Sequence, residues 1–360
     1  MVARRSSSVL VGPRSLTFVD ASSLSLHGVH VRSSQKLLVM LALCSACGSP
    51  ESRPWALVAH HLPAALLSVW GTSDHDVYAV GGDLGDGSGP EVVHWDGSAW
   101  NHLATGQTGD LWWVFGFANG PIYMGGAGGM ILRYESGVFT RMTTPGINTV
   151  FGMWGSSPTD MWAVGGAVGG ANGAFAWRLQ GDTWVDNHLL PATFSSTDVI
   201  WKMYGRSAND AWMVATNGNA LRWDGTTVTL VPTGAHESLF TVHADADRYV
   251  AVGGFGTGIV LENTGAGWTN ASPAVASPGL VGVRLSPEGD FAVGQEGAVY
   301  SRAGGDWNEV PTGQSLDESF HSVWIDDKGG VWAVGGQVLT LPLVDGTVMY
   351  GGASAPGELQ

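Results

Sequence analysis

Short apolar runs recur along the chain in pairs, with a polar turn between the two runs and glycine after the second. The clearest pair is VFGMWGSSPTDMWAVGG at Val150–Gly166. The same plan is repeated at Ser68–Gly82, Met203–Ala215 and Ser322–Gly336. Beyond the N-terminal region, no stretch has the i, i+3, i+4 apolar spacing of an amphipathic helix over several turns. The pattern therefore predicts an all-β protein built from hairpins.

The hairpins recur at a regular distance. The residue that ends the first strand of each unit, here named the ruler residue, is in turn Trp70, Phe115, Trp154, Tyr204, His243, Arg284 and Trp324. Successive ruler residues are 45, 39, 50, 39, 41 and 40 positions apart. Repeats of about 40–50 residues with about four short strands each are typical of propeller blades. We therefore predict a seven-bladed β-propeller of four-stranded antiparallel blades over residues 55–350.

Each unit carries signals for four strands, named A to D in chain order. In the first unit they are Leu67–Trp70, Val77–Val80, Val92–Trp95 and a strand that begins at Trp100. Residues that favour turn dihedral angles fill the A–B segment, and a D-G or G-G pair precedes several of the D strands. The A–B and C–D turns then lie on one face of the ring, and the B–C and D–A connections lie on the other.

Both ends of the chain have the pattern of a strand that completes the last blade. One candidate is Trp55–Leu62 and the other is Thr347–Tyr350. We expect the N-terminal strand to join the last blade, because this ties the chain ends together and removes an exposed sheet edge. Residues 351–360 are expected to form a flexible tail.

The repeat resembles the W-G-S-x-x-D-x-W-A-V-G propeller repeats of many secreted bacterial proteins, and more loosely the Kelch and BNR-like propellers. As in the Kelch pattern, Gly81-Gly82 is followed by two spaced aromatic residues, Trp95 and Trp100. The resemblance covers residues 63–345. It implies a binding or scaffolding lipoprotein and names no substrate.

Composition narrows the class of partner. Of 360 residues, 44% are hydrophobic and 13% charged, and the 54 Gly and 17 Trp suit many tight turns between aromatic-rich strands. Without residues 1–46, 11 Lys and Arg stand against 30 Asp and Glu, a net charge of −19. Such a surface repels phosphate backbones, so we expect no nucleic-acid partner.

The N-terminal region has the pattern of an export signal. Arg32 and Lys36 precede an apolar run at 37–43, which is too short for a membrane-spanning helix of about 20 residues. Small residues then lead to Cys47, with Cys44 three positions earlier. This ending resembles the lipobox of bacterial lipoproteins, in which the cysteine carries the lipid, so Cys47 is the predicted lipidation site.

Residues 1–47 are therefore predicted to be a signal segment, with 1–30 an overextended translation start, and residues 48–54 to be a tether. The residue after Cys47 is Gly48. An acidic residue at this position would resemble an inner-membrane retention signal, so Gly48 favours an outer-membrane lipoprotein of a bacterial cell envelope. A secreted protein whose signal is cleaved without lipidation is the alternative. The 2 cysteines both lie in the signal segment, so no disulfide is expected in the propeller.

No catalytic or metal-binding motif stands out in the repeats. The 11 His are scattered without ligand spacing such as HExxH, and no metal site is predicted. Calcium at Asp83, Asp86 and Glu91 stays open as an alternative, although their spacing matches no EF-hand loop. One carboxylate recurs at the same place in three blades, where it is expected to cap a turn by accepting backbone N–H groups: Asp76, Asp160 and Asp210.

The candidate ligand site is placed where the units break their own symmetry. The B–C loops at 83–90 and 167–173 and the D–A stretch at 187–198 are long, and loops that depart from a rigid scaffold often carry binding. All of them are predicted on the B–C and D–A face. The ligand site is therefore expected on this face, toward blades one to four.

Two side chains in particular break the pattern of the A strands. Two positions before the ruler residue, five of the seven units have a small residue, whereas the other two have Trp113 and Lys202. Trp112 aligns with apolar residues in other units and is predicted to be core. The predicted site consists of Trp113, Lys202, Asp83, Asp86 and Asn172. A Trp113 that only fills space between blades is the alternative.

These features predict a membrane-anchored, extracytoplasmic propeller that acts as a binding or assembly scaffold for a glycan, peptide or protein. The alternative is a propeller-type glycoside hydrolase or polysaccharide lyase, although no nucleophile motif or catalytic cluster supports an enzyme. No cofactor is predicted.

Overall fold

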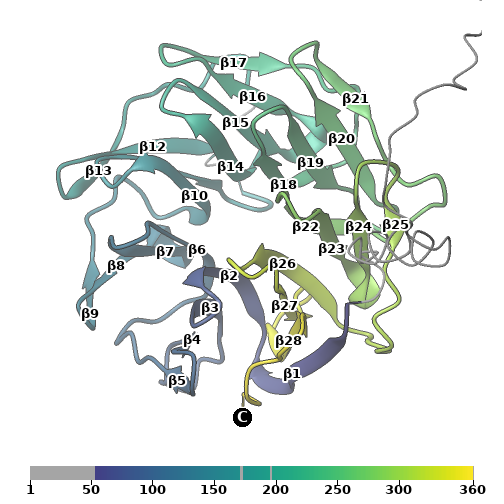
Figure 1. Cartoon of the computed structure of the whole chain (residues 1–360). Helices are drawn as coiled ribbons and strands as arrows, with labels where there is room; N and C mark the ends of the chain where they lie inside the picture. The colour runs from purple at the N-terminus through teal and green to yellow at the C-terminus, as the bar shows by residue number, and fades with distance from the viewer. Residues whose placement is uncertain (1–52, 171–172, 195–196, 360) are drawn as a thin grey trace, which may run out of the picture. The chain divides into compact units, whose positions relative to one another are not determined.

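Seven four-stranded antiparallel sheets surround a common axis in the computed structural model, which describes residues 53–170, 173–194 and 197–359 (Figure 1). The seven-bladed β-propeller predicted from the repeat spacing is confirmed. The signal segment, Cys47, most of the tether and Asn172 lie outside the described residues. Within these residues no helix has the length and apolar character needed to cross a membrane.

Strand A of each blade lies nearest the axis and strand B pairs with it. The A strands are β2 (Leu66–Ser73), β6 (Leu111–Gly116), β10 (Thr149–Ser157), β14 (Ile200–Ser207), β18 (Leu239–Ala244), β22 (Leu280–Arg284) and β26 (Ser319–Ile325). The B strands are β3 (Asp76–Asp83), β7 (Ile122–Gly126), β11 (Asp160–Gly166), β15 (Asp210–Ala215), β19 (Tyr249–Gly253), β23 (Asp290–Gly294) and β27 (Val331–Gln337).

Strands C and D form the outer half of each blade. The C strands are β4 (Pro90–Trp95), β8 (Ile131–Glu135), β12 (Phe175–Gln180), β16 (Ala220–Trp223), β20 (Ile259–Asn263), β24 (Val299–Arg302) and β28 (Val344–Gly351). The D strands are β5 (Trp100–His102), β9 (Val138–Arg141), β13 (Thr183–Asp186), β17 (Val228–Val231), β21 (Trp268–Asn270), β25 (Asn308–Glu309) and β1 (Trp55–Ala64). Three B–C connections contain a 3₁₀ turn: η2 (Ala127–Gly129), η3 (Thr216–Gly218) and η4 (Gln295–Gly297).

The N-terminal strand closes the ring. The last sheet has the order β1-β28-β27-β26, so β1 is its outermost strand and pairs antiparallel with β28. The expected N-terminal closure is confirmed. Thr347–Tyr350 lies in β28 and is the third strand of the same blade, so the two candidate segments pair with each other instead of competing.

The C-terminal end of the chain differs from the flexible tail expected for residues 351–360. Gly351 ends strand β28, and Leu359 is buried. The Leu359 backbone N–H donates to the Val58 carbonyl at 2.9 Å, and the indole N–H of Trp100 donates to the Gly357 carbonyl at 2.9 Å. A single apolar residue is a weak sequence signal for an ordered segment. Leu359 nevertheless packs into the apolar cluster of the last blade and holds this segment against the ring.

Every blade contains a β-bulge near the start of strand A. In the first blade Leu66 pairs with Gly81 and Ser68 with Val80, so Leu67 has no partner on strand B. The same register shift recurs in all seven described A–B pairs. The strand B residue that pairs just before the bulge is glycine in every blade except the fourth. A Cβ on Gly81 would lie 1.9 Å from the Ala65 carbonyl oxygen, which explains this preference.

Neighbouring blades are joined by tryptophan rings that cover glycines. The Trp70 ring lies over Gly116 of the next blade, where an added Cβ would be 2.6 Å from Trp70 Cη2. The same contact joins Trp154 to Gly205 and Trp324 to Gly71. This contact of a Trp ring with a Gly of the next blade is named the connector. Trp70-Gly71 has both roles, because Trp70 packs on the following blade and Gly71 receives Trp324 of the preceding one.

Four blades lack this tryptophan, and in three cases the following blade has a larger residue at the glycine position; after Phe115 the following blade keeps Gly155, which Phe117 approaches. Tyr204, His243 and Arg284 are followed in the next blade by Ala244, Leu285 and Ile325, respectively. The Leu285 backbone N–H donates to His243 Nδ1 at 3.2 Å. Smaller or polar ruler residues thus face larger partners, which keeps the filling of the contact similar around the ring.

The recurring aspartates differ from the expected turn caps. Asp76 accepts from the Thr72 hydroxyl and from His94 Nε2, and Asp210 accepts from Arg206 Nε at 2.8 Å. Asp160 accepts from Ser156 and Arg178. Each of the three carboxylates accepts from the side chain four residues earlier, at the end of strand A. In two blades it also accepts from a side chain on strand C, so these carboxylates hold the strand ends together. They lie in three separate blades, as the symmetry predicts.

Gly116→Ala tests the connector. We expect a loss of about 1–3 kcal/mol, because the added methyl group overpacks against the Trp70 ring. In a Trp70→Ala background the same change should be nearly neutral, since the two atoms nearest the new Cβ belong to Trp70. A double-mutant cycle of denaturant unfolding measures this coupling. Equal costs in both backgrounds would show that the Trp70 ring does not fill this contact.

Candidate functional site

The bulge residues of the A strands surround a hollow on the B–C and D–A face, here named the central mouth. Six of the seven bulge residues line it: Trp112, Phe151, Trp201, Phe240, Val281 and His321. Its volume is about 250 Å³. Edge-to-face contacts connect the lining rings, with centroids 5.1 Å apart for Trp112–Phe151 and 5.6 Å apart for Trp201–Phe240. The bulge re-aims one side chain per blade, and together these side chains build the mouth.

The sequence predicts a core role for Trp112 and a surface role for Trp113, and the structure differs. Trp112 lines the mouth. Trp113 lies partly buried one layer deeper, and its indole N–H donates to the Met153 carbonyl on the next blade at 2.8 Å. Strict alternation along a strand would place Trp112 and Trp113 on opposite sides, but the bulge at Trp112 breaks this alternation. Trp113 therefore matches the alternative in which it fills space between blades.

Trp113 and Lys202 meet although they come from blades two and four. Lys202 Nζ lies 4.6 Å from the Trp113 ring centroid and donates to the Phe151 carbonyl at 2.6 Å. Lys202 is only 4% exposed. On the intervening blade, Gly152 lets the strands approach closely, since a Cβ there would lie 2.9 Å from Lys202 Cα. The two residues that break the repeat pattern thus form one cation–π contact beneath the mouth.

Burial lowers the pKa of both basic groups of the mouth. Burial lowers the pKa of Lys202 to about 7. Burial, and secondarily the proximity of Lys202, lower the pKa of His321 to about 3, against a hydrogen bond that raises it. His321 is therefore neutral, and its Nδ1–H donates to the Leu67 carbonyl. The described residues that line the mouth include no carboxylate. The mouth is consequently an apolar hollow without a described carboxylate, and Lys202 is its one partly protonated group near pH 7.

Exposed apolar side chains surround the mouth. Val168, Phe255 and Leu339, all on B–C connections, line it and are 68%, 59% and 53% exposed. Four further large apolar residues that are exposed lie on connections of the same face: Leu84, Ile147, Val275 and Leu341. The remaining one among the described residues, Val138, lies at the start of strand D in blade two. Such one-sided clustering of exposed apolar side chains is typical of an interaction surface.

One polar group in the mouth is left without a partner. Trp201 Nε1 is buried and has no hydrogen-bond partner among the described residues. Three other side chains of the lining donate to backbone carbonyls: Lys202, His321 and Thr241, the last to Val281 at 2.6 Å. A buried N–H without an acceptor costs about 1–3 kcal/mol.

Asp83 and Asp86 hold their own loop. Asp83 accepts from the backbone N–H groups of Gly85 and Gly109 at 2.8 and 2.6 Å. Asp86 accepts from Ser88. Neither carboxylate lines the central mouth, and Glu91 pairs instead with His102 at 2.8 Å. The structure thus brings Trp113 and Lys202 together, but it does not add Asp83 or Asp86 to them.

Comparisons with known proteins agree with the propeller fold. No family profile matches the chain, and no curated sequence matches it. The WD40 β-propeller domain of Doa1 is 13% identical with a TM-score of 0.62, covering 82% of this chain and 96% of that one. YCF48 bound to D1 peptide is 14% identical with a TM-score of 0.60, covering 84% and 97%. The extracellular domain of the putative hybrid two-component system BT4673 from B. thetaiotaomicron is 14% identical with a TM-score of 0.59, covering 82% and 39%. At these identities, the likeness shows the propeller fold alone.

Lys202→Met tests the protonation state of the buried lysine. The folded pKa of about 7 lies below the ordinary 10.5, so the unfolded chain binds more protons between these pH values. Lys202 should therefore make the free energy of unfolding rise with pH, by up to about 1.4 kcal/mol per pH unit. The stability difference between wild type and Lys202→Met should increase in favour of wild type from about pH 7.5 to about pH 9.5.

The control for this prediction is Lys328→Met, because Lys328 is exposed and should leave the pH slope of stability unchanged. Denaturant unfolding at both pH values measures the differences. A Lys202→Met difference that is constant with pH would mean that Lys202 keeps its ordinary pKa in the folded protein.

Proposed function

We propose that this chain is an extracytoplasmic binding or assembly propeller whose central mouth holds an apolar side chain of a peptide or protein partner. The observation that carries the proposal is the aromatic mouth, without a described carboxylate, within a rim of exposed apolar side chains. A preformed apolar hollow whose lining includes one unpartnered donor suits a side chain next to a backbone carbonyl. The carbonyl would accept from Trp201 Nε1.

Among the partner classes expected from the sequence, a peptide or protein fits the mouth better than a glycan. A glycan presents several hydroxyl groups, and these need several hydrogen-bond partners. The Lys202, His321 and Thr241 donors are already engaged with backbone carbonyls. The propeller structure of YCF48 with D1 peptide offers a parallel for peptide binding by this fold.

The alternative function, a glycoside hydrolase or polysaccharide lyase, finds no support in the mouth. Glycosidases use two carboxyl groups about 5–10 Å apart. The mouth lining has none in the part of the chain that the structure describes. We therefore favour binding without catalysis.

The proposal includes a lipid anchor at Cys47 in a bacterial outer membrane, and membership of the secreted W-G-S-x-x-D-x-W-A-V-G repeat proteins. Its support is the lipobox-like sequence and the place where the chain enters the ring. Arg53 donates to the carbonyls of Gly329 and Gly351, at the A–B turn of blade seven and the end of its strand C. The tether thus joins the face opposite to the mouth, which would direct the mouth away from the membrane.

Cys47→Ala tests the anchor. We expect the variant expressed in a bacterium to lose palmitate labelling and detergent partitioning, because the cysteine that carries the lipid is gone. Cys44→Ala, three residues earlier, should keep both properties. Labelling that persists in Cys47→Ala would contradict lipidation at this residue.

Binding at the mouth can be tested with a phage-displayed peptide library selected against the propeller. Enriched peptides should share a large apolar residue. Trp201→Phe, which removes the unpartnered N–H, and Phe255→Ser, which removes an apolar rim contact, should each weaken binding about tenfold or more, or about 1.4 kcal/mol. Val138→Ser changes an exposed apolar residue away from the mouth and should have no effect.

Fluorescence polarisation with the enriched peptides measures these affinities. The proposed site would be overturned if the selected peptides bound Trp201→Phe and Phe255→Ser, like the control Val138→Ser, as tightly as wild type. A glycan and polysaccharide panel, tested for binding and hydrolysis, completes the experiment. Glycan binding lost in Trp201→Phe would replace the peptide assignment, and hydrolysis would restore the enzyme alternative.

A further inference from the structure

Two adjacent histidines on strand β1 face the same carboxylate. His60 and His61 have stacked rings with centroids 3.8 Å apart. The pairing of β1 with β28 has a register shift between Ala59 and Leu62, and His61 has a φ of 60°. Adjacent side chains on a regular strand point to opposite faces. The irregularity in β1 therefore brings both imidazoles to one side.

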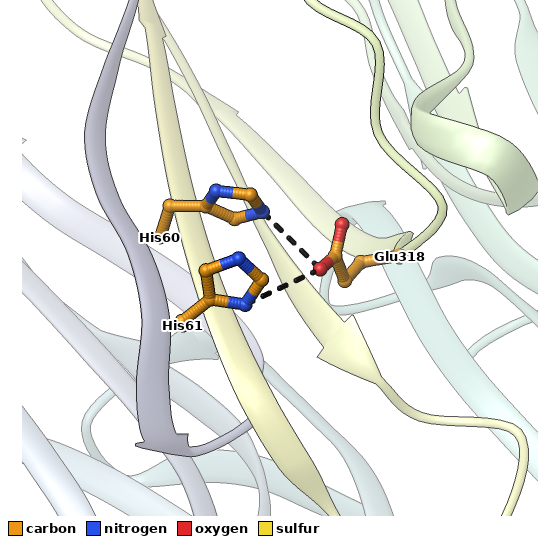
Figure 2. A group of neighbouring side chains, drawn as sticks. All are labelled: His60, His61 and Glu318. Atoms are coloured by element: carbon orange, nitrogen blue, oxygen red, sulfur yellow. Dashed lines mark hydrogen bonds and ion pairs between the residues drawn. The ribbon is translucent and has the colours of Figure 1, made fainter.

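The carboxylate is Glu318, which directly precedes β26 (Figure 2). Its Oε1 lies 3.2 Å from His60 Nε2 and 3.8 Å from His61 Nδ1. Asp345 on β28 adds a second carboxylate, with Oδ1 3.7 Å from His61 Nδ1. Asp345 also has a positive φ, of 56°. Two non-glycine residues in the left-handed region thus face each other at this cluster, and such conformations gather at ligand-holding sites.

The cluster has spare acceptor capacity. Glu318 Oε2 is buried and has no hydrogen-bond partner among the described residues. The described ion pairs of Glu318 are those with the two histidines, so no lysine or arginine neutralises it. The ligand atoms of His60, His61 and Glu318 all lie within 4.8 Å of one another. In a tetrahedral zinc site, ligands at about 2.0–2.2 Å from the ion are about 3.3–3.6 Å apart. The distances from Glu318 Oε1 to the two imidazole nitrogens, 3.2 and 3.8 Å, are near this spacing.

We propose that His60, His61 and Glu318 bind a divalent transition metal ion, Zn²⁺, with water, or Asp345 after a shift of its side chain, in the fourth position. Imidazole nitrogens and carboxylate oxygens are common zinc ligands. The site goes beyond the binding function of the mouth. It joins the first strand of the propeller, β1, to β28 and to the connection that enters blade seven, so the ion would fasten the blade in which the two chain ends meet.

Zinc titration of the propeller, residues 48–360 without a polyhistidine tag, tests the site. Calorimetry should give one Zn²⁺ per chain, and the thermal unfolding midpoint should rise with Zn²⁺ concentration and fall back with chelator, because an ion that binds the folded state stabilises it by mass action. Co²⁺ in place of Zn²⁺ should give the visible absorption of four-coordinate cobalt.

Glu318→Gln and His60→Ala should each weaken Zn²⁺ binding by about 100-fold or more, since loss of even a group that only hydrogen-bonds to a metal ligand costs about 10–100-fold. The matched control is His188→Ala. His188 also has a positive φ, of 52°, and lies 3.4 Å from a carboxylate, Asp186, but this cluster has no second histidine. Its loss should leave zinc binding unchanged.

Glu318→Gln keeps the side-chain size, and circular dichroism without metal checks that it folds. No zinc-dependent shift of the wild-type midpoint, or equal zinc binding by wild type and Glu318→Gln, would overturn the proposal. Peptide binding at the mouth is independent of these outcomes, because none of the four residues lines it.

Discussion

The β-bulge of strand A is the constraint on which the other features of the ring depend. One extra residue per blade re-aims a side chain, and six of these seven residues line the mouth. The bulge also brings the start of strand A close to strand B, which leaves no room for a Cβ at Gly81 and favours glycine in six of the seven blades. A single local irregularity therefore explains both the glycine that closes strand B and the aromatic lining of the mouth.

The sequence predicts the repeating part of the fold well because the same strand pattern occurs in seven units, so each unit supports the assignment of the others. Blade number, strand order and closure by β1 follow from patterns that recur in most units and from the need to pair a sheet edge. Trp112 shows where this reasoning fails. Its alignment with Leu67 and Phe240 is correct, because all three are bulge residues. The prediction that Trp112 is core fails because it assumes that side chains alternate strictly along strand A. The glycine opposite the bulge is the signal that marks this position as irregular.

His60 and His61 show the same limit at the other irregular strand. Ligand spacings that are read from a sequence describe helices and loops in which the ligands are a few residues apart. Here Glu318 is far from the histidines in sequence, and only the closure of blade seven places it beside them. The register shift in β1 that aims both imidazoles at Glu318 leaves no hydrophobic pattern in the sequence. Contacts made by ring closure are therefore the part of a propeller site that repeats do not reveal.

The distribution of charge explains how an acidic propeller can present an apolar face. After the signal segment, 30 acidic residues stand against 11 basic ones, and the resulting mutual repulsion limits self-association. The mouth escapes this acidic charge because its lining has no described carboxylate, and burial lowers the pKa of both its basic groups, Lys202 and His321. With a pKa of about 7, Lys202 is partly protonated at neutral pH, and the Phe151 carbonyl and the Trp113 ring are the groups that face its charge. The hollow is therefore most apolar above pH 7, where the amine is neutral, and protonation at lower pH would disfavour an apolar side chain there.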